Sequence, residues 1–276
     1  MADGRHPLED GCPEDWVTAW GQDEYGIFVG FEVGGVEQRL RWIGPGRFEM
    51  GSPDGELGQD DDETRHTVTL TQGYWMADTP VTQALWAAVM GDNPSHFKGD
   101  ETRPVESVSW DDSQRFIELL NDTVVGLNAR LPTEAEWERG CRAGTKTATY
   151  AGDLEADQVA PVLEAIAWYG HNSGDTTQPV KRKQPNAWGL YDTLGNVSEW
   201  CQDYAYRTYT SEPQQDPTGA ATGGYRVFRG GPWGGRARGV RAAYRNGGVP
   251  DDRFSGLGLR LVRDQAVRKD QVPEGE

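Results

Sequence analysis

Residues 224–263 read GYRVFRGGPWGGRARGVRAAYRNGGVPDDRFSGLGLRLVR, and this is the most informative stretch of the chain. It contains nine arginines and no lysine, glutamate or cysteine. The residues between the arginines differ widely in character, as Gly234, Tyr244 and Phe254 do. Arginine suits buried, hydrogen-bonded ion pairs. The pattern therefore predicts a rigid arginine framework whose intervening positions serve another purpose.

The charge of the chain supports this interpretation. The stretch carries nine arginines against Asp251 and Asp252, a balance of +7, while all 276 residues carry −17. The rest of the chain must therefore carry −24, and we expect the arginines to pair with buried acids of the same domain. So acidic a chain is not a general binder of nucleic acid or of acidic membranes.

Composition indicates an irregular, loop-rich fold, because 36 glycines and 11 tryptophans accompany a hydrophobic fraction of only 36%. Three cysteines, Cys12, Cys141 and Cys201, are far apart and odd in number, so no disulfide framework or zinc spacing is predicted. The N-terminus is polar and no apolar run approaches the length of a membrane span. We expect a cytoplasmic protein without a signal peptide.

The chain is predicted to form one main domain. Residues 1–37 are expected to be an N-terminal extension packed on or leading into it, 38–263 the domain itself, and 264–276 a polar tail. Strands are predicted at Gln38–Ile43, Arg47–Met50 and His66–Leu70. The acidic run in 51–65 reads as a solvated loop.

Three helices are signalled by their first turns. Thr79 is predicted to cap a helix that has Pro80 at its first position and ends before Gly91. Ser109 with Asp112 forms a capping box for a second helix. Thr133 with Glu136 does the same for a third, and helix signals stop after Cys141.

Eight short phrases, in this order, resemble the formylglycine-generating enzyme or sulfatase-modifying factor superfamily: Gly46–Ser52, Thr79–Gln83, Pro104–Trp110, Arg130–Glu138, Pro185–Asp192, Gly195–Trp200, Arg229–Trp233 and Gly258–Arg260. The resemblance covers about residues 40–262. It implies an α+β fold of the C-type lectin-like kind, with little regular secondary structure. One departure from the family pattern is Pro232, where serine is usual.

The resemblance does not carry the family's oxidase chemistry with it. Formylglycine-generating enzymes use a copper-binding cysteine pair in the segment that corresponds to Trp233–Val240, and this segment has no cysteine. Cys141 and Cys201 lie elsewhere and are interpreted as buried structural residues. A second branch of the superfamily binds iron through histidines, but the four histidines here are scattered. We expect no copper and no catalytic residue.

Calcium is the metal that the resemblance does suggest. Family members bind structural calcium near the GNxxEW turn, and hard oxygen ligands in a tight loop suit this ion. The alternative is that Glu199 only pairs with an arginine. The positions that match the family's ligands are Asp192 and Glu199 through carboxylates, and Gly195 and Val197 through carbonyls.

The resemblance extends to the variable proteins of diversity-generating retroelements, which share this fold. Their randomised codons exclude Lys, Glu, Gln, Met and Trp, and none of these five types occurs in residues 234–262. Trp233, Tyr244 and Phe254 would act as aromatic anchors among adaptable small residues. We predict a variable region at 233–256 with these ligand-binding positions: Trp233, Gly234, Gly235, Arg236, Gly239, Tyr244, Asn246, Gly247, Gly248, Asp252, Phe254, Ser255 and Gly256.

These observations favour a non-catalytic binding protein whose C-terminal surface varies, with an unknown protein, peptide or glycan as ligand. Two alternatives stay open at this point. One is a superfamily enzyme with altered oxidase-type chemistry, and the other is a regulatory or scaffold domain of a signalling system.

Overall fold

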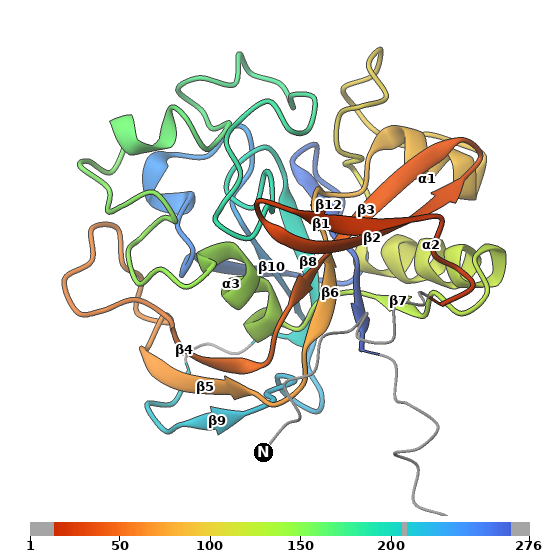
Figure 1. Ribbon diagram of the computed structural model, residues 1–276. Helices are drawn as coiled ribbons and strands as arrows, with labels where there is room; N and C mark the ends of the chain where they lie inside the picture. The colour runs from red at the N-terminus through yellow and green to blue at the C-terminus, as the bar shows by residue number, and fades with distance from the viewer. Residues whose placement is uncertain (1–13, 206–208, 266–276) are drawn as a thin grey trace, which may run out of the picture.

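The computed structural model describes residues 14–205 and 209–265, so Cys12 and most of the predicted C-terminal tail lie outside the described residues. Within the described part, three α-helices accompany short strands and long loops, with α1 and α2 at one side of the molecule (Figure 1). The fold is mixed α+β and C-type lectin-like, in agreement with the prediction from the sequence. No helix in these residues is both long and apolar enough to cross a membrane.

The main sheet runs in the order β1-β2-β3-β6-β13-β7. Residues 19–37, which the sequence assigned to an N-terminal extension, contribute β1 and β2 to it. The last strand, β13, lies between β6 and β7, so the end of the domain is held inside the sheet. The strands are β1 (Ala19–Asp23), β2 (Gly26–Val33), β3 (Val36–Ile43), β6 (Tyr74–Ala77), β7 (Ala129–Arg130) and β13 (Val262–Asp264).

Two smaller sheets complete the strands. A four-stranded sheet has the order β11-β10-β8-β12, in which only β12 runs parallel to its neighbour. A three-stranded sheet has the order β4-β5-β9, along the lower edge of Figure 1. Their strands are β4 (Gly46–Met50), β5 (His66–Leu70), β8 (Ser198–Tyr204), β9 (Gln214–Gln215), β10 (Arg226–Arg229), β11 (Arg245–Gly248) and β12 (Leu257–Leu259).

The α-helices are α1 (Gln83–Met90), α2 (Trp110–Thr123) and α3 (Glu134–Arg142), and both predicted capping boxes are present in α2 and α3. The predicted start of the first helix is wrong, because the cap is Thr82 and not Thr79. Val81 is extended there: its N–H donates to the Leu259 carbonyl, and its own carbonyl accepts from Val105. Sheet-like pairing with a distant segment thus overrides the local Thr-Pro signal.

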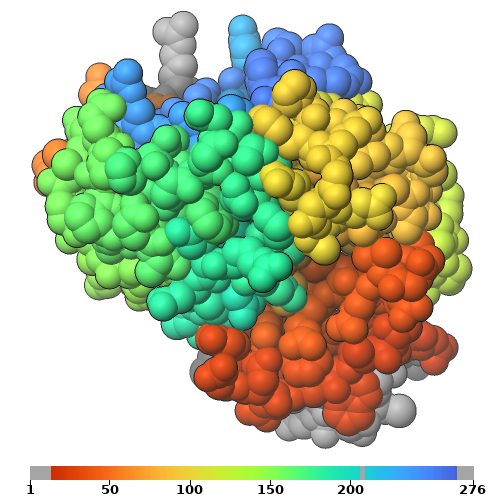
Figure 2. Space-filling view, turned by 90° about the horizontal axis from the view of Figure 1, so that it is seen from above, coloured from red at the N-terminus to blue at the C-terminus, as the bar shows by residue number. Residues whose placement is uncertain are grey.

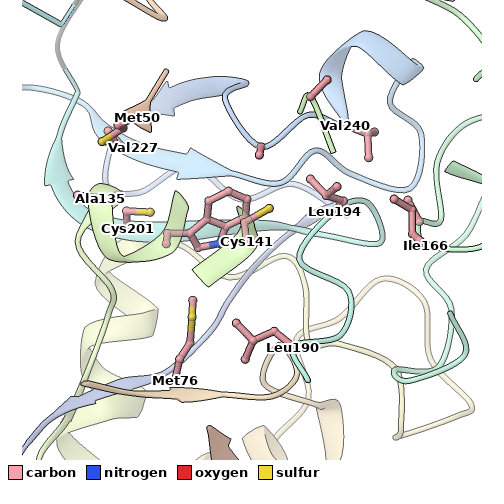
Figure 3. Close-up of a cluster of buried hydrophobic side chains, with 14 of the residues drawn as sticks. Met50, Met76, Ala135, Cys141, Ile166, Leu190, Leu194, Cys201, Val227 and Val240 are labelled. Carbon is pink, nitrogen blue, oxygen red and sulfur yellow. The ribbon is translucent and has the colours of Figure 1, made fainter. Parts of the chain in front are cut away.

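Two buried hydrophobic clusters form the core. One gathers around Trp137 and Tyr169, and the other around Trp86, Phe116 and Trp200. Figure 3 shows part of the first cluster, with Cys141 and Cys201 among aliphatic and methionine side chains. The structural interpretation of these two cysteines is confirmed, since both are buried and neither forms a disulfide.

Candidate functional site

The thirteen predicted binding positions are carried by the β10–β11 hairpin and by the loops that flank it. A turn of 3₁₀-helix, η2 (Ala237–Gly239), lies between the two strands. Their exposure is uneven, because the Phe254 side chain is 51% exposed whereas Gly248 is buried. Gly234, Arg236 and Asn246 are also exposed, and the others are half-buried. The structure groups most of them into three clusters.

The first cluster surrounds Trp233. Its ring meets Phe97 edge to face with centroids 5.2 Å apart, and its Nε1 donates to the Ser255 carbonyl at 2.8 Å. Gly256 lies against Trp233 and Pro232. Figure 2 shows this blue C-terminal part of the chain bordering the yellow segment around Phe97. Phe97 was not predicted, because it lies far from the arginine framework in sequence.

The second cluster surrounds Tyr244. The amide of Asn246 donates to its hydroxyl at 3.3 Å, and Gly239 faces its ring. Tyr244, Asn246 and Gly247 line a pocket of about 380 Å³ whose other wall is the acidic run at residues 60–62. The acidic loop therefore borders the predicted variable region, a neighbourhood that the sequence did not indicate.

The third cluster joins Gly248 and Asp252. The Asp252 carboxylate accepts the Val249 N–H at 2.9 Å and closes the loop after β11. A Cβ atom at Gly248 would meet that carboxylate at 2.6 Å and the Trp200 ring at 3.3 Å. Gly248 therefore has less room for a side chain than the neighbouring exposed positions.

The backbone at the predicted glycine positions is ordinary. None of the six glycines from Gly234 to Gly256 in the predicted set has φ in the left-handed region, whereas Gly230 and Gly231 just before them have φ of +98° and +74°. A Cβ atom at Gly234 would meet no atom within 4 Å. Only glycine adopts the left-handed region without strain, so Gly230 and Gly231 are framework while the later positions accept any residue in backbone terms.

Buried ion pairs fix four of the arginines between which these positions lie, as the charge balance predicted. Arg229 donates to Glu138 and, at 2.6 Å, to the carbonyls of Ala243 and Tyr244. The Arg229 side chain is fully buried, so these hydrogen bonds anchor the backbone of the variable segment to the protein interior. Further pairs to buried acids are Arg245–Glu134 at 2.8 Å, Arg260–Glu199 at 2.8 Å and Arg241–Glu63 at 2.6 Å.

The interpretation of the acidic run in 51–65 as a solvated loop holds for Asp61, which is exposed, but is wrong for Glu63 and Glu56. Glu63 is fully buried and Glu56 nearly so, and both carboxylates bind the Arg241 guanidinium. Asp60 pairs with Arg238 at the surface, at 2.9 Å. The loop therefore holds the C-terminal segment in place through these ion pairs. Local sequence could not reveal this role, because Arg241 and Glu63 are 178 residues apart.

Cys141 and Cys201 are poorly suited to thiolate chemistry. Burial raises the pKa of Cys141 to about 12 and that of Cys201 well above its usual value. A thiol in that state is neither a good nucleophile nor a ready copper ligand at neutral pH. The segment Trp233–Val240 offers glycine and arginine where the family's cysteine pair would lie.

The predicted calcium ligands do not all fit that ion. The Glu199 carboxylate accepts from the Arg260 guanidinium and, at 2.7 Å, from the Trp137 indole, so its charge is balanced. Burial raises the pKa of Asp192 to about 6, so this carboxyl is still mostly ionised at neutral pH. Calcium binding by Asp192, Gly195, Val197 and Glu199 stays a prediction, and the pairing of Glu199 argues against it.

Comparison with known proteins places this arrangement in a family. A model of the sulfatase-modifying factor enzyme 1-like domain matches residues 35–265. The chain belongs to this family. The matched residues include the arginine framework at 224–263 and the acidic loop at 51–65 that pairs with it. The framework is therefore part of the sulfatase-modifying factor domain.

Individual relatives of this sulfatase-modifying factor domain differ in kind. Treponema denticola variable protein 1 is 35% identical with a TM-score of 0.75, over 85% of this chain and 98% of that one. A formylglycine-generating enzyme of Streptomyces coelicolor is 35% identical over 65% of this chain, but the match spans only 59% of that enzyme. PvdO from Pseudomonas aeruginosa shares the fold, with a TM-score of 0.74 at 24% identity over 90% of this chain and 98% of that one.

Proposed function

We propose that the protein is a non-catalytic ligand-binding member of the family, whose binding surface spans Trp233–Gly256 and varies between related copies. The observation that carries this proposal is the contrast between the glycines. Gly230 and Gly231 need positive φ, while the predicted variable glycines have ordinary φ that other residue types also adopt, although a side chain at Gly248 or Gly256 would have to displace Asp252 or Pro232. Positions that tolerate other residue types are expected of a binding surface whose side chains vary on a rigid scaffold.

The framework supports the same function. Arg229, Arg241, Arg245 and Arg260 are held by acids outside the variable positions. Exchange of the residues between them therefore leaves these buried pairs intact. Binding residues on loops that a rigid scaffold positions are the general arrangement of variable recognition surfaces.

The ligand is a protein, peptide or glycan. Trp233, Tyr244 and Phe254 supply rigid aromatic area, and small neighbours adapt around them, as in antibody paratopes. The similarity to Treponema denticola variable protein 1 supports diversification as the source of the variety. An enzyme with altered chemistry is the alternative, and it lacks a nucleophile in the segment where the family's cysteines lie.

The coding DNA over residues 224–263 tests the proposal. We expect a near-copy of this region close to the gene, a neighbouring reverse transcriptase, and differences between copies concentrated at the twelve predicted positions from Gly234 to Gly256, since the randomised codons do not encode Trp233. Identical sequences over 234–256 in sibling strains, together with the lack of a template copy, would contradict diversification of this region. Copper(I) titration separates the enzyme alternative, because tight binding would contradict the loss of the cysteine chemistry.

A further inference from the structure

The pair Asn246–Gly247 in β11 carries two groups that can react with one another. Asparagine is a thermolabile residue type. When glycine follows it, the glycine nitrogen can attack the asparagine side-chain carbonyl, because glycine has no Cβ atom to hinder the approach. Asn246–Gly247 is the only Asn-Gly pair in the 276-residue sequence. It lies in the edge strand of the four-stranded sheet, and Asn246 is exposed.

The hydrogen bonds of this pair bring the two reacting groups together. The Gly247 N–H donates to Asn246 Oδ1 at 2.8 Å, so the side-chain carbonyl lies beside the nitrogen that would attack it. The amide nitrogen of Asn246, which would leave, points instead to the Tyr244 hydroxyl at 3.3 Å. Both contacts are local and exposed, so the side chain can turn its carbonyl carbon towards the Gly247 nitrogen without disturbing the core.

The pair Asn172–Ser173 offers a comparison within the same molecule. Asn172 Oδ1 accepts the Tyr169 N–H at 3.0 Å, and the amide nitrogen of Asn172 donates to the Ala167 carbonyl at 3.1 Å. Ser173 is only 1% exposed, and its own N–H donates to the Tyr169 carbonyl at 2.9 Å. Attack of the Ser173 nitrogen on Asn172 would break all three hydrogen bonds. The structure therefore protects Asn172 and leaves Asn246 open to reaction.

We propose that Asn246 deamidates in the folded protein through a cyclic succinimide. The Gly247 nitrogen gives its proton to base and forms a bond to Asn246 Cγ, while the bond from Cγ to the side-chain nitrogen breaks. That nitrogen takes a proton from water or from the Tyr244 hydroxyl and leaves as ammonia. Water then opens the ring at either carbonyl, which gives aspartate or isoaspartate at position 246. The reaction consumes only water, and it does not depend on the function proposed above.

The products change the edge of the variable segment. Both carry a new carboxylate in the wall of the pocket that Asp60, Asp61 and Asp62 also line. Isoaspartate in addition lengthens the main chain by one atom, in a strand where Asn246 pairs with Phe228 of β10. We therefore expect this part of the surface to become more acidic and less regularly paired as the protein ages.

Incubation of the full chain at pH 8, followed by peptide mapping with mass spectrometry, tests the proposal. We expect a mixture of isoaspartate and aspartate at position 246, formed faster as pH rises because the Gly247 nitrogen must lose its proton. Asn172 should stay intact. Aspartate without isoaspartate would indicate direct hydrolysis and would overturn the succinimide route. Asn246 that survives in the folded protein, while the urea-unfolded chain is converted, would overturn the proposal as well.

Two variants separate the geometry from the dipeptide itself. Gly247→Ala adds a Cβ atom beside the attacking nitrogen and should slow the reaction at least about tenfold. Ser173→Gly is the matched control, because it gives Asn172 a glycine neighbour while the Asn172 side chain keeps its hydrogen bonds. We expect Asn172 in this variant to react at least about tenfold more slowly than Asn246 in the same molecule. Equal rates at the two sites, or an unchanged rate in Gly247→Ala, would contradict the proposal.

Discussion

At the residue scale, Gly231 and Gly234 are three positions apart and face different constraints. Gly231 has φ of +74°, and a Cβ atom there would lie 2.2 Å from the Gly239 carbonyl oxygen. Gly231→Ala should therefore cost about 2 kcal/mol or more of unfolding free energy. Gly234→Tyr should change it by less than about 0.5 kcal/mol, because no atom crowds the site. Urea denaturation measures both, and equal losses would contradict the division into framework and variable glycines.

The carboxyl of Asp203 makes a residue-scale prediction about pH. Burial raises its pKa from the ordinary value of 3.8 to about 8 in the folded protein, so the folded state binds this proton more tightly than the unfolded state. The stability that this group contributes is therefore present below about pH 4 and is lost as pH rises towards 8. The free energy of unfolding of Asp203→Asn should fall less between pH 5 and pH 8 than that of the parent. Parallel curves over this range would show that Asp203 is ionised throughout.

Glu199 gives a third test at the same scale. Because Arg260 and Trp137 occupy its carboxylate, we expect added calcium to leave the melting temperature of chelator-treated protein unchanged. Magnesium at the same concentration controls for ionic strength. A rise of several degrees with calcium alone would mean that Arg260 yields Glu199 to the ion, as the family resemblance implies.

At the element scale, the acidic loop and the segment after η2 depend on one another. Glu63→Gln leaves the buried Arg241 guanidinium with one partner fewer, and loss of a partner in a buried pair costs about 3–5 kcal/mol. Asp60→Asn is the matched control, since the Asp60–Arg238 pair is partly exposed and should cost at most about 1 kcal/mol. Chemical denaturation measures the unfolding free energy of both variants. Similarly small losses of unfolding free energy in both variants would contradict this dependence and would favour the solvated role that the composition of the loop suggests.

The same elements show what sequence can and cannot predict. The starts of α2 and α3 follow from residues three apart, and so the capping boxes at Ser109 and Thr133 predict them correctly. The start of α1 depends on Val81 pairing with distant backbone, and the role of Glu63 depends on a partner 178 residues away. Contacts of that range leave no local pattern. The arginine framework was predictable because charge balance demands partners, although it does not say which.

At the scale of the whole molecule, the variable segment is tied at both ends. It begins after β10, which pairs with β8, and it ends before β12, which pairs with the same strand. Then β13 closes the main sheet between β6 and β7. The segment is therefore a loop system spanning fixed strands, and its ends cannot move apart when its residues change.

Joint replacement tests this view of the molecule. We expect variants changed together at Gly234, Arg236, Tyr244 and Asn246 to unfold cooperatively, with a melting temperature within about 5 °C of the parent, because none of the four side chains belongs to a buried ion pair. Replacement of Arg229, Arg241 and Arg245 by methionine is the matched control. It strands three buried or nearly buried carboxylates, those of Glu56, Glu63 and Glu134, and should abolish cooperative unfolding. Should the first set also unfold, the segment would be structural and could not serve as a surface that varies.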